Sequence, residues 1–231
     1  LFGGNGTSVG RNLGSGGAPL TIGANVTVHA AKDATINIGT GGTNQGTILA
    51  DTTGADLTIN GSNWINAATG TVTASGGSLT ANGMLRNDGT IVVSGGTFGL
   101  NTGDNTSVWT NPGTLRLDSG TLNLGGRITT ATFDTITRPN DADRGTFNVR
   151  ATIDNTGSTL TFDDDTGAVN LTSGLGTILN GSVAITSGGS LRSTQGFFQD
   201  VTLLNDMVLE GNDQLRVLGT LTLANGVTFQ I

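Results

Sequence analysis

Two acidic segments hold the side chains of this sequence that are best suited to catalysis. Polysaccharide lyases and hydrolases use paired carboxylates, or carboxylate-bound calcium beside a basic residue. The candidates are Asp163, Asp164 and Asp165, and Asp141 and Asp143 beside Arg138 and Arg144. Because alternate residues of a strand point to opposite faces, the three consecutive aspartates cannot all converge on one site. We interpret them as a solvated turn, and segment 138–144, which has no His, Lys, Tyr or Cys, as a lateral loop.

Other catalytic and metal-binding patterns are weak. His29 is the one histidine, and the chain has no cysteine and no Gly-x-Ser-x-Gly elbow, so we expect neither zinc nor a serine triad. Segment 3–8 approaches a calcium-binding Gly-Gly-x-Gly-x-Asp repeat but lacks its aspartate. There is no P-loop or dinucleotide fingerprint. We therefore predict no cofactor, no metal and no catalytic residue, and expect that the chain is not an enzyme.

Charge and composition argue against several classes of partner. The net charge is −7 and the ten basic residues are dispersed, whereas nucleic acids and anionic lipids need clustered Lys and Arg. No apolar run approaches the roughly 20 residues of a membrane helix. The 39 glycines lack the three-residue period of collagen, and 12% charged residues with three prolines are unlike a disordered chain. We expect no nucleic-acid partner and no membrane insertion in this segment.

One pattern recurs along the chain: an apolar residue, any residue, Asn, a short gap, Gly, Thr or Ser, and then alternating apolar residues. The signature asparagines are Asn44, Asn66, Asn87, Asn111, Asn155 and Asn180. They are separated by 22, 21, 24, 44 and 25 residues, which indicates a period near 22. The interval of 44 predicts two periods with one degenerate copy around residues 140–147.

Each period divides into three short strands with period-two alternation, broken by Ser-Gly, Gly-Gly or Asn-Gly corners. Gly and Asn suit corners because they adopt positive φ at little cost. Three strands in about 22 residues predict an all-β fold, a single-stranded parallel β-helix of roughly ten coils and about 50 Å, with the right-handed crossover as the expected hand. We expect one continuous β-solenoid over 1–231, with an irregular lateral loop at about 130–150.

Stacked coils place equivalent residues above one another, about 4.8 Å apart. The predicted core stack is Ile48, Val72, Ile91, Leu115, Val183, Leu79, Phe98, Leu122 and Leu191. The signature asparagines are predicted to form a ladder, with side-chain amides hydrogen-bonded from coil to coil. Trp64 and Trp109 share a repeat position with Leu85, so we expect them in the core rather than stacked on sugars. The outward position after the signature Thr varies from Leu49 to Arg116, which disfavours an ice-binding threonine array.

These repeats resemble the right-handed parallel β-solenoids of bacterial surface proteins: filamentous-haemagglutinin-like adhesins, autotransporter passenger domains and repetitive exoprotein filaments. The segments that carry the resemblance are 70–100, 111–126, 180–194 and 213–223. It covers most of the chain and implies an extracellular or cell-surface location. It does not choose a function, because the same solenoid carries adhesins, lyases and phage tailspikes.

A repeat without a catalytic constellation favours a non-enzymatic extracellular solenoid: a rod-like spacer, an adhesin segment or a head-to-tail stacking filament subunit. Residues 227–231 keep a strand pattern, and an uncovered coil end would template further pairing. The expected partners are further copies, through the solenoid ends, or a glycan or other cell-surface ligand. The alternative is a carbohydrate-active enzyme, a polysaccharide lyase or hydrolase. That alternative requires a groove with two or more carboxylates near a basic residue, beside segment 138–144.

Overall fold

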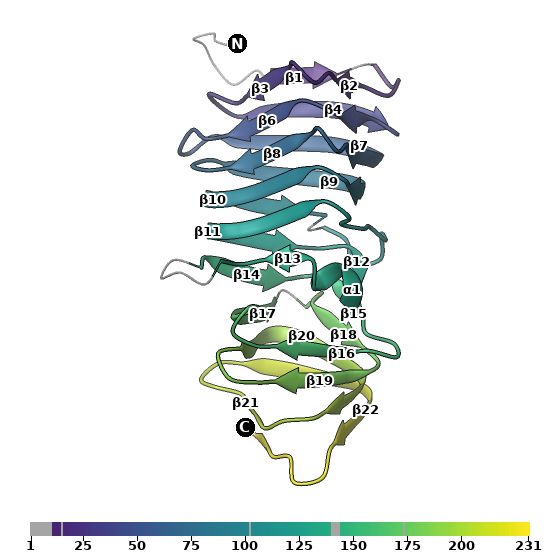
Figure 1. The fold of residues 1–231 in the computed structure, drawn as a ribbon, viewed down its shortest axis with the longest axis vertical. Coiled ribbons are helices and arrows are strands. Elements are labelled where there is room, and N and C mark those ends of the chain that lie inside the picture. The colour runs from purple at the N-terminus through teal and green to yellow at the C-terminus, as the bar shows by residue number, and fades with distance from the viewer. Residues whose placement is uncertain (1–10, 15, 102, 140–143, 173) are drawn as a thin grey trace.

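The protein is an all-β parallel solenoid of about ten coils, with about 22 residues in each turn. The computed structural model describes residues 11–231 except 15, 102, 140–143 and 173. The coils stack along the longest axis, and β1 and β22 lie toward opposite ends of that axis (Figure 1). Every described strand pairing is parallel, for example Leu57 with Leu79, one coil further along the chain. The predicted fold class is therefore confirmed.

Each coil contributes strands to three faces, which we call the first, second and third faces. The first face contains β3 (Thr27–His29), β6 (Thr47–Ala50), β8 (Thr71–Ala74), the starts of β10 (Thr90–Leu100) and β11 (Thr114–Leu124), β13 (Ile136–Thr137), β16 (Thr159–Phe162) and β19 (Ser182–Ile185). The second contains β1 (Arg11–Gly14), β4 (Ala34–Thr40), the starts of β7 (Asp56–Asn66) and β9 (Ser78–Asn87), the ends of β10 and β11, β14 (Thr146–Val149), β17 (Ala168–Thr172) and the start of β20 (Ser190–Leu203).

The third face contains β2 (Thr21–Ile22), β5 (Thr43–Asn44), the ends of β7 and β9, β12 (Arg127–Thr129), β15 (Thr152–Asp154) and β18 (Thr177–Leu179). The later parts of β20 pair with β18 and β19, and β22 (Gln214–Leu223) pairs with β20. A separate ladder joins β21 (Met207–Val208) to β23 (Phe229–Gln230). The one described helix, α1 (Thr130–Phe133), interrupts the coil between β12 and β13. Among the described residues, no helix has the length and apolar character needed to cross a membrane.

Alternation along the strands fills the interior of the coils. In β6 the residues alternate between half-buried and buried, and Ile48 and Ala50 point inward. Columns such as Ile48, Val72, Ile91 and Leu115 are in register from coil to coil. All nine residues named as the core stack are buried, Leu191 being the most exposed of them at 4%. Full burial of one such side chain contributes roughly 1.5–3 kcal/mol, so the repeated column is the main source of stability.

The repeat position of the two tryptophans differs in one detail from the position counted along the sequence. Trp64 and Trp109 are buried, and their indole N–H groups donate to the carbonyls of Asn82 and Gly125 at 2.8 and 3.0 Å. The partner of Trp64 in the next coil is Met84, not Leu85, which is 42% exposed. The register shifts at this corner between Asn60 and Ile65, so counting along the sequence misplaces the inward residue by one.

Candidate functional site

The signature asparagines form a buried hydrogen-bonded row along the third face. Asn44 donates from Nδ2 to Asn66 Oδ1 at 2.8 Å, Asn66 to Asn87 at 2.7 Å, and Asn87 to Asn111 at 2.6 Å. All four side chains are buried. Each amide thus satisfies one donor and one acceptor inside the protein, where an unpaired polar group would cost about 1–3 kcal/mol. We call this row the inner ladder.

Two threonines of the coil that contains α1 contact the inner ladder from either side, with no described hydrogen bond between them. Asn111 Nδ2 donates to Thr135 Oγ1 at 2.9 Å, and Thr130 Oγ1 donates to Asn155 Oδ1 at 2.7 Å. Thr129 pairs with Asp154, so Thr130 occupies the position next to Asn155. The degenerate copy of the repeat therefore lies at Thr130 and not around residues 140–147. That expectation was wrong because a hydroxyl replaces the amide at the ladder position.

Asn180 lies outside the inner ladder, contrary to its assignment from the sequence. Its backbone is left-handed, with φ of 62°, and its Nδ2 donates to Thr156 Oγ1 on the surface at 2.8 Å. The ladder ends one step earlier, where Asn155 Nδ2 donates to the carbonyl of Ser182 at 2.7 Å. The left-handed corner at Asn180 and Gly181 turns this side chain outward.

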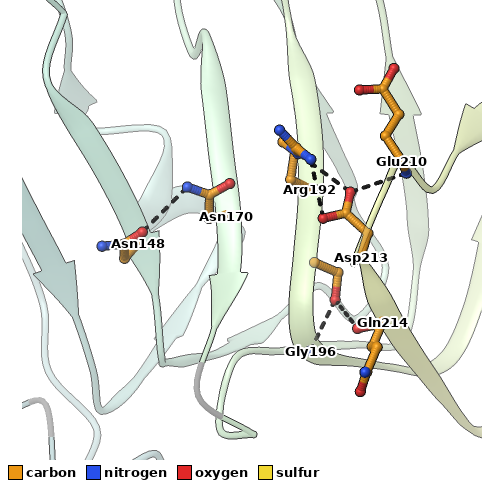
Figure 2. A network of polar contacts seen from close by, with 8 residues as sticks. Asn148, Asn170, Arg192, Gly196, Glu210, Asp213 and Gln214 are labelled. Atoms are coloured by element: carbon orange, nitrogen blue, oxygen red, sulfur yellow. Dashed lines mark hydrogen bonds and ion pairs between the residues drawn. The ribbon is translucent and has the colours of Figure 1, made fainter.

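Additional asparagine contacts on the second face were missed by the sequence analysis. Asn82 Nδ2 donates to Asn60 Oδ1 at 3.0 Å, and Asn148 Nδ2 to Asn123 Oδ1 at 2.9 Å. Figure 2 shows the next step, from Asn170 to Asn148 at 3.3 Å, together with the Arg192–Asp213 ion pair of the following coils. We call these contacts the outer ladder. Its signal is present in the sequence, because these asparagines are also spaced by 22 to 25 residues.

The only described helix stands beside a break in the first face. Thr129 caps α1, its Oγ1 accepting a hydrogen bond from the Thr132 amide at 3.2 Å. β13 pairs with β11, and β16 pairs with β19, but no described ladder joins β13 to β16. A cleft of about 660 Å³ lies between them. The coils remain joined across the same step by β14 with β17 and by β15 with β18.

Carboxylates and guanidinium groups from several elements line this cleft. They are Asp134, Asp163, Asp165, Arg116 and Arg138. The aspartates of the 163–165 triplet and Arg138 were candidate site residues from the sequence, whereas Asp134 and Arg116 were not. Asp134 follows α1 directly, and no sequence signal announces a helix of only four residues. The triplet itself lies in a turn, and Asp164 is paired with Arg144 Nη2 at 3.3 Å instead of lining the cleft.

Asp134 and Asp163, whose charges interact across the cleft, have pKa values shifted in opposite directions. Partial burial, and then the charge of Asp163, raise the pKa of Asp134. Backbone and hydroxyl hydrogen bonds from Thr166, both 3.0 Å long, lower the pKa of Asp163. Opposite shifts within one cleft are the arrangement that separates a proton donor from a proton acceptor.

Arg138 is a buried cation held by backbone carbonyls. Its side chain donates to the carbonyls of Thr166 and Ala168 at 2.6 and 2.7 Å and to that of Gly145 at 3.1 Å. The guanidinium lies 5.7 Å from the ring centre of Phe147. Burial, and then the nearby charge of Arg144, lower the pKa of Arg138. Its Nε is buried without a hydrogen-bond partner among the described residues.

The remaining candidates lie elsewhere. His29 contacts Asp51 through Nε2 on the surface, where 37% and 38% of the two side chains are exposed, far along the chain from the cleft residues. Asp141, Asp143 and segment 3–8 lie outside the described residues. Leu49, Thr73, Val92 and Arg116 form one register row, so the outward position does vary between coils. Within the described part of the chain, no three acidic or histidine side chains are grouped to hold a metal ion.

Comparison with protein-family models, with curated proteins and with solved structures finds no match to this chain.

Proposed function

We propose that this chain is a non-enzymatic structural and adhesive rod of a bacterial protein that is secreted or held at the cell surface. The observation that carries the proposal is the parallel register, which runs from the pairing of β1 with β4 to the pairing of β20 with β22. A stacked solenoid holds its two ends at a fixed separation and presents long faces of polar side chains. Both properties suit a spacer or an adhesin segment.

The coil formed by β22 supports a role in self-association. β22 pairs with β20, and no described strand covers its other edge. Val217, Leu218 and Leu223 on this coil are 44%, 45% and 41% exposed. An open parallel edge with apolar side chains favours the addition of a further coil, from the same polypeptide or from a second copy. Head-to-tail stacking of copies would make the rod a filament subunit.

A carbohydrate-active enzyme is the second candidate, and the cleft favours it. A groove with several carboxylates and a basic residue beside segment 138–144 was the feature required for this alternative, and Asp134, Asp163 and Arg138 line such a groove. The opposite pKa shifts of the two aspartates suit an acid and a base.

Small-angle X-ray scattering at several concentrations tests the rod. About ten coils spaced by about 4.8 Å should give a cross-section that stays constant and a length of roughly 50 Å, or multiples of it if copies stack. A compact spherical particle would contradict the proposal. Release of reducing ends from polysaccharides, lost in both Asp134→Asn and Asp163→Asn but kept in Asp56→Asn on β7, would instead favour the enzyme.

A further inference from the structure

We propose that the cleft between β13 and β16 binds a segment of neutral polysaccharide. The inference rests on the proposed adhesive function and names the ligand class of that function. The cleft is a gap in the first face, between coils whose other two faces are paired, with a volume of about 660 Å³. Such a volume falls within the range that small-ligand sites occupy, about 300–1,000 Å³.

The hydrogen-bonding groups of the cleft wall are of three kinds. Ionised Asp134, Asp163 and Asp165 accept only, half-exposed Arg116 donates only, and Thr159, like other hydroxyls of the wall, can do both. A ligand that satisfies all three kinds must offer donors and acceptors side by side along its length. Sugar hydroxyls do this, since each is one donor and two acceptors.

The charge of the cleft favours a neutral chain over an acidic one. Three aspartates line it, and of the two arginines Arg116 already pairs with Asp118 at 2.7 Å. Arg138 is engaged by backbone carbonyls and lies over Phe147. A polyanion would therefore meet an excess of negative charge. Ile136 and Pro139 add apolar surface for the C–H faces of a sugar ring.

An extended peptide fits the same cleft less well. Peptides that add to a sheet edge are held by a ladder of backbone hydrogen bonds. β13 has only the two residues Ile136–Thr137, and β16 has four, Thr159–Phe162. Two residues cannot support such a ladder, whereas side-chain contacts to hydroxyl groups need no continuous strand.

The test is isothermal titration calorimetry of the intact chain with three neutral hexasaccharides, cellohexaose, maltohexaose and xylohexaose. Oligogalacturonate of equal length and a six-residue threonine-rich peptide are the comparison probes. We expect at least one neutral hexasaccharide to bind more tightly than both comparison probes. Asp134→Asn should weaken that binding on the order of tenfold, because a charge-assisted hydrogen bond is replaced by a neutral one. Thr159→Trp, at an exposed wall position, should abolish it by filling the cleft.

Asp56→Asn, an exposed carboxylate on β7, is the matched control and should leave binding unchanged. Circular dichroism and scattering of each variant separate loss of the site from loss of the rod. Tighter binding of oligogalacturonate or of the peptide, no binding of any neutral hexasaccharide at millimolar concentration, or binding that survives Thr159→Trp in a folded rod would overturn the inference while leaving the rod intact. Hydrolysis of a bound hexasaccharide would support the cleft as a glycan site and contradict the non-enzymatic function.

Discussion

The coils between β4 and β11 and the coils around α1 keep the same period but are held together differently. In the first region, which we call the closed region, all three faces are paired, the third partly through an isolated bridge between Arg86 and Thr110, and the inner ladder runs from Asn44 to Asn111 without interruption. Around α1 one part of the ladder ends at Thr135, the next part begins at Thr130, and the first face opens between β13 and β16. Pairing on the second and third faces is enough to keep these coils stacked, which frees the first face to form a cleft.

The largest effect should come from removing an aromatic side chain from the closed region. Phe98 is fully buried between Leu79 and Leu122 of the neighbouring coils, and Phe98→Ala should lower the free energy of unfolding by about 3–5 kcal/mol. Phe133 stacks on Phe147 at 5.6 Å beside the cleft. Phe133→Ala should cost roughly 2 kcal/mol, because the surroundings of an open site can relax into the space. Urea denaturation measures both, and equal costs would mean that the α1 coil is packed as tightly as the others.

The second largest difference should be between the stability lost by breaking the inner ladder and that lost by breaking the outer ladder. Asn66→Ala leaves Asn44 Nδ2 and Asn87 Oδ1 without their partners inside the protein, and we expect a loss of about 2–4 kcal/mol. Asn82→Ala breaks an exposed contact with Asn60 and should cost less than about 1 kcal/mol. Both sites lie in the closed region, so the comparison isolates burial. Similar losses at the two sites would show that the inner amides are not the stronger contacts.

Removing the hydroxyl of Thr130 should lower stability less than removing the amide of Asn66 from the inner ladder. Thr130→Val keeps the shape of the side chain but removes the hydroxyl that donates to Asn155, leaving one buried acceptor unpaired. We expect a loss of about 1–3 kcal/mol in thermal or urea unfolding. Thr132→Val is the control on the same helix, since Thr132 is not part of the inner ladder. No difference between the two variants would remove Thr130 from the ladder.

The smallest effects should appear in the pH dependence of stability, with opposite signs in the two regions. Hydrogen bonds from Ser107 and then Thr106 lower the pKa of Asp104 from 3.8 to about 2, so its contribution is present above pH 4 and is lost as pH falls to about 2. Asp104→Asn should therefore destabilise at pH 5 and match the parent chain near pH 2. Burial raises the pKa of Asp134, so its ionisation opposes folding once pH rises past its ordinary value.

Asp134→Asn should accordingly raise stability near pH 6 relative to the parent chain, with the difference shrinking in acid. Urea titrations of both variants from pH 2 to pH 6 measure the two trends. If Asp134→Asn destabilises the protein at pH 6, the carboxylate is stabilised in the cleft and its raised pKa is contradicted.

The closed region is also the part that the sequence predicts best. A period near 22 with asparagine at one position is visible because an amide ladder requires the same residue type in every coil, as at Asn44, Asn66 and Asn87. Thr130 carries no such signal in a chain rich in threonine. The shift from Leu85 to Met84 is invisible for a different reason: the corner absorbs an irregularity that only the backbone reveals.

The cleft was only partly predictable. Asp163 and Asp165 were visible in the sequence as part of three consecutive aspartates. Their position in the same cleft as Asp134 depends on α1, a helix too short to leave a periodic pattern. Arg138 was assigned to a lateral loop, whereas its guanidinium is buried against carbonyls of the next coil. Contacts between coils across an opened face follow from three-dimensional placement and not from the repeat.

Disulfide formation between neighbouring coils tests the parallel stacking most directly. Thr58 and Thr80 are register partners on β7 and β9, and the chain has no cysteine of its own. Stacked strands place such Cα atoms about 4.8 Å apart, within the range that a disulfide spans. The account predicts that the pair T58C/T80C oxidises rapidly in the folded monomer, while N63C/T73C, whose residues would face each other in an antiparallel hairpin of β7 with β8, does not. Efficient cross-linking of the second pair and none of the first would contradict the solenoid.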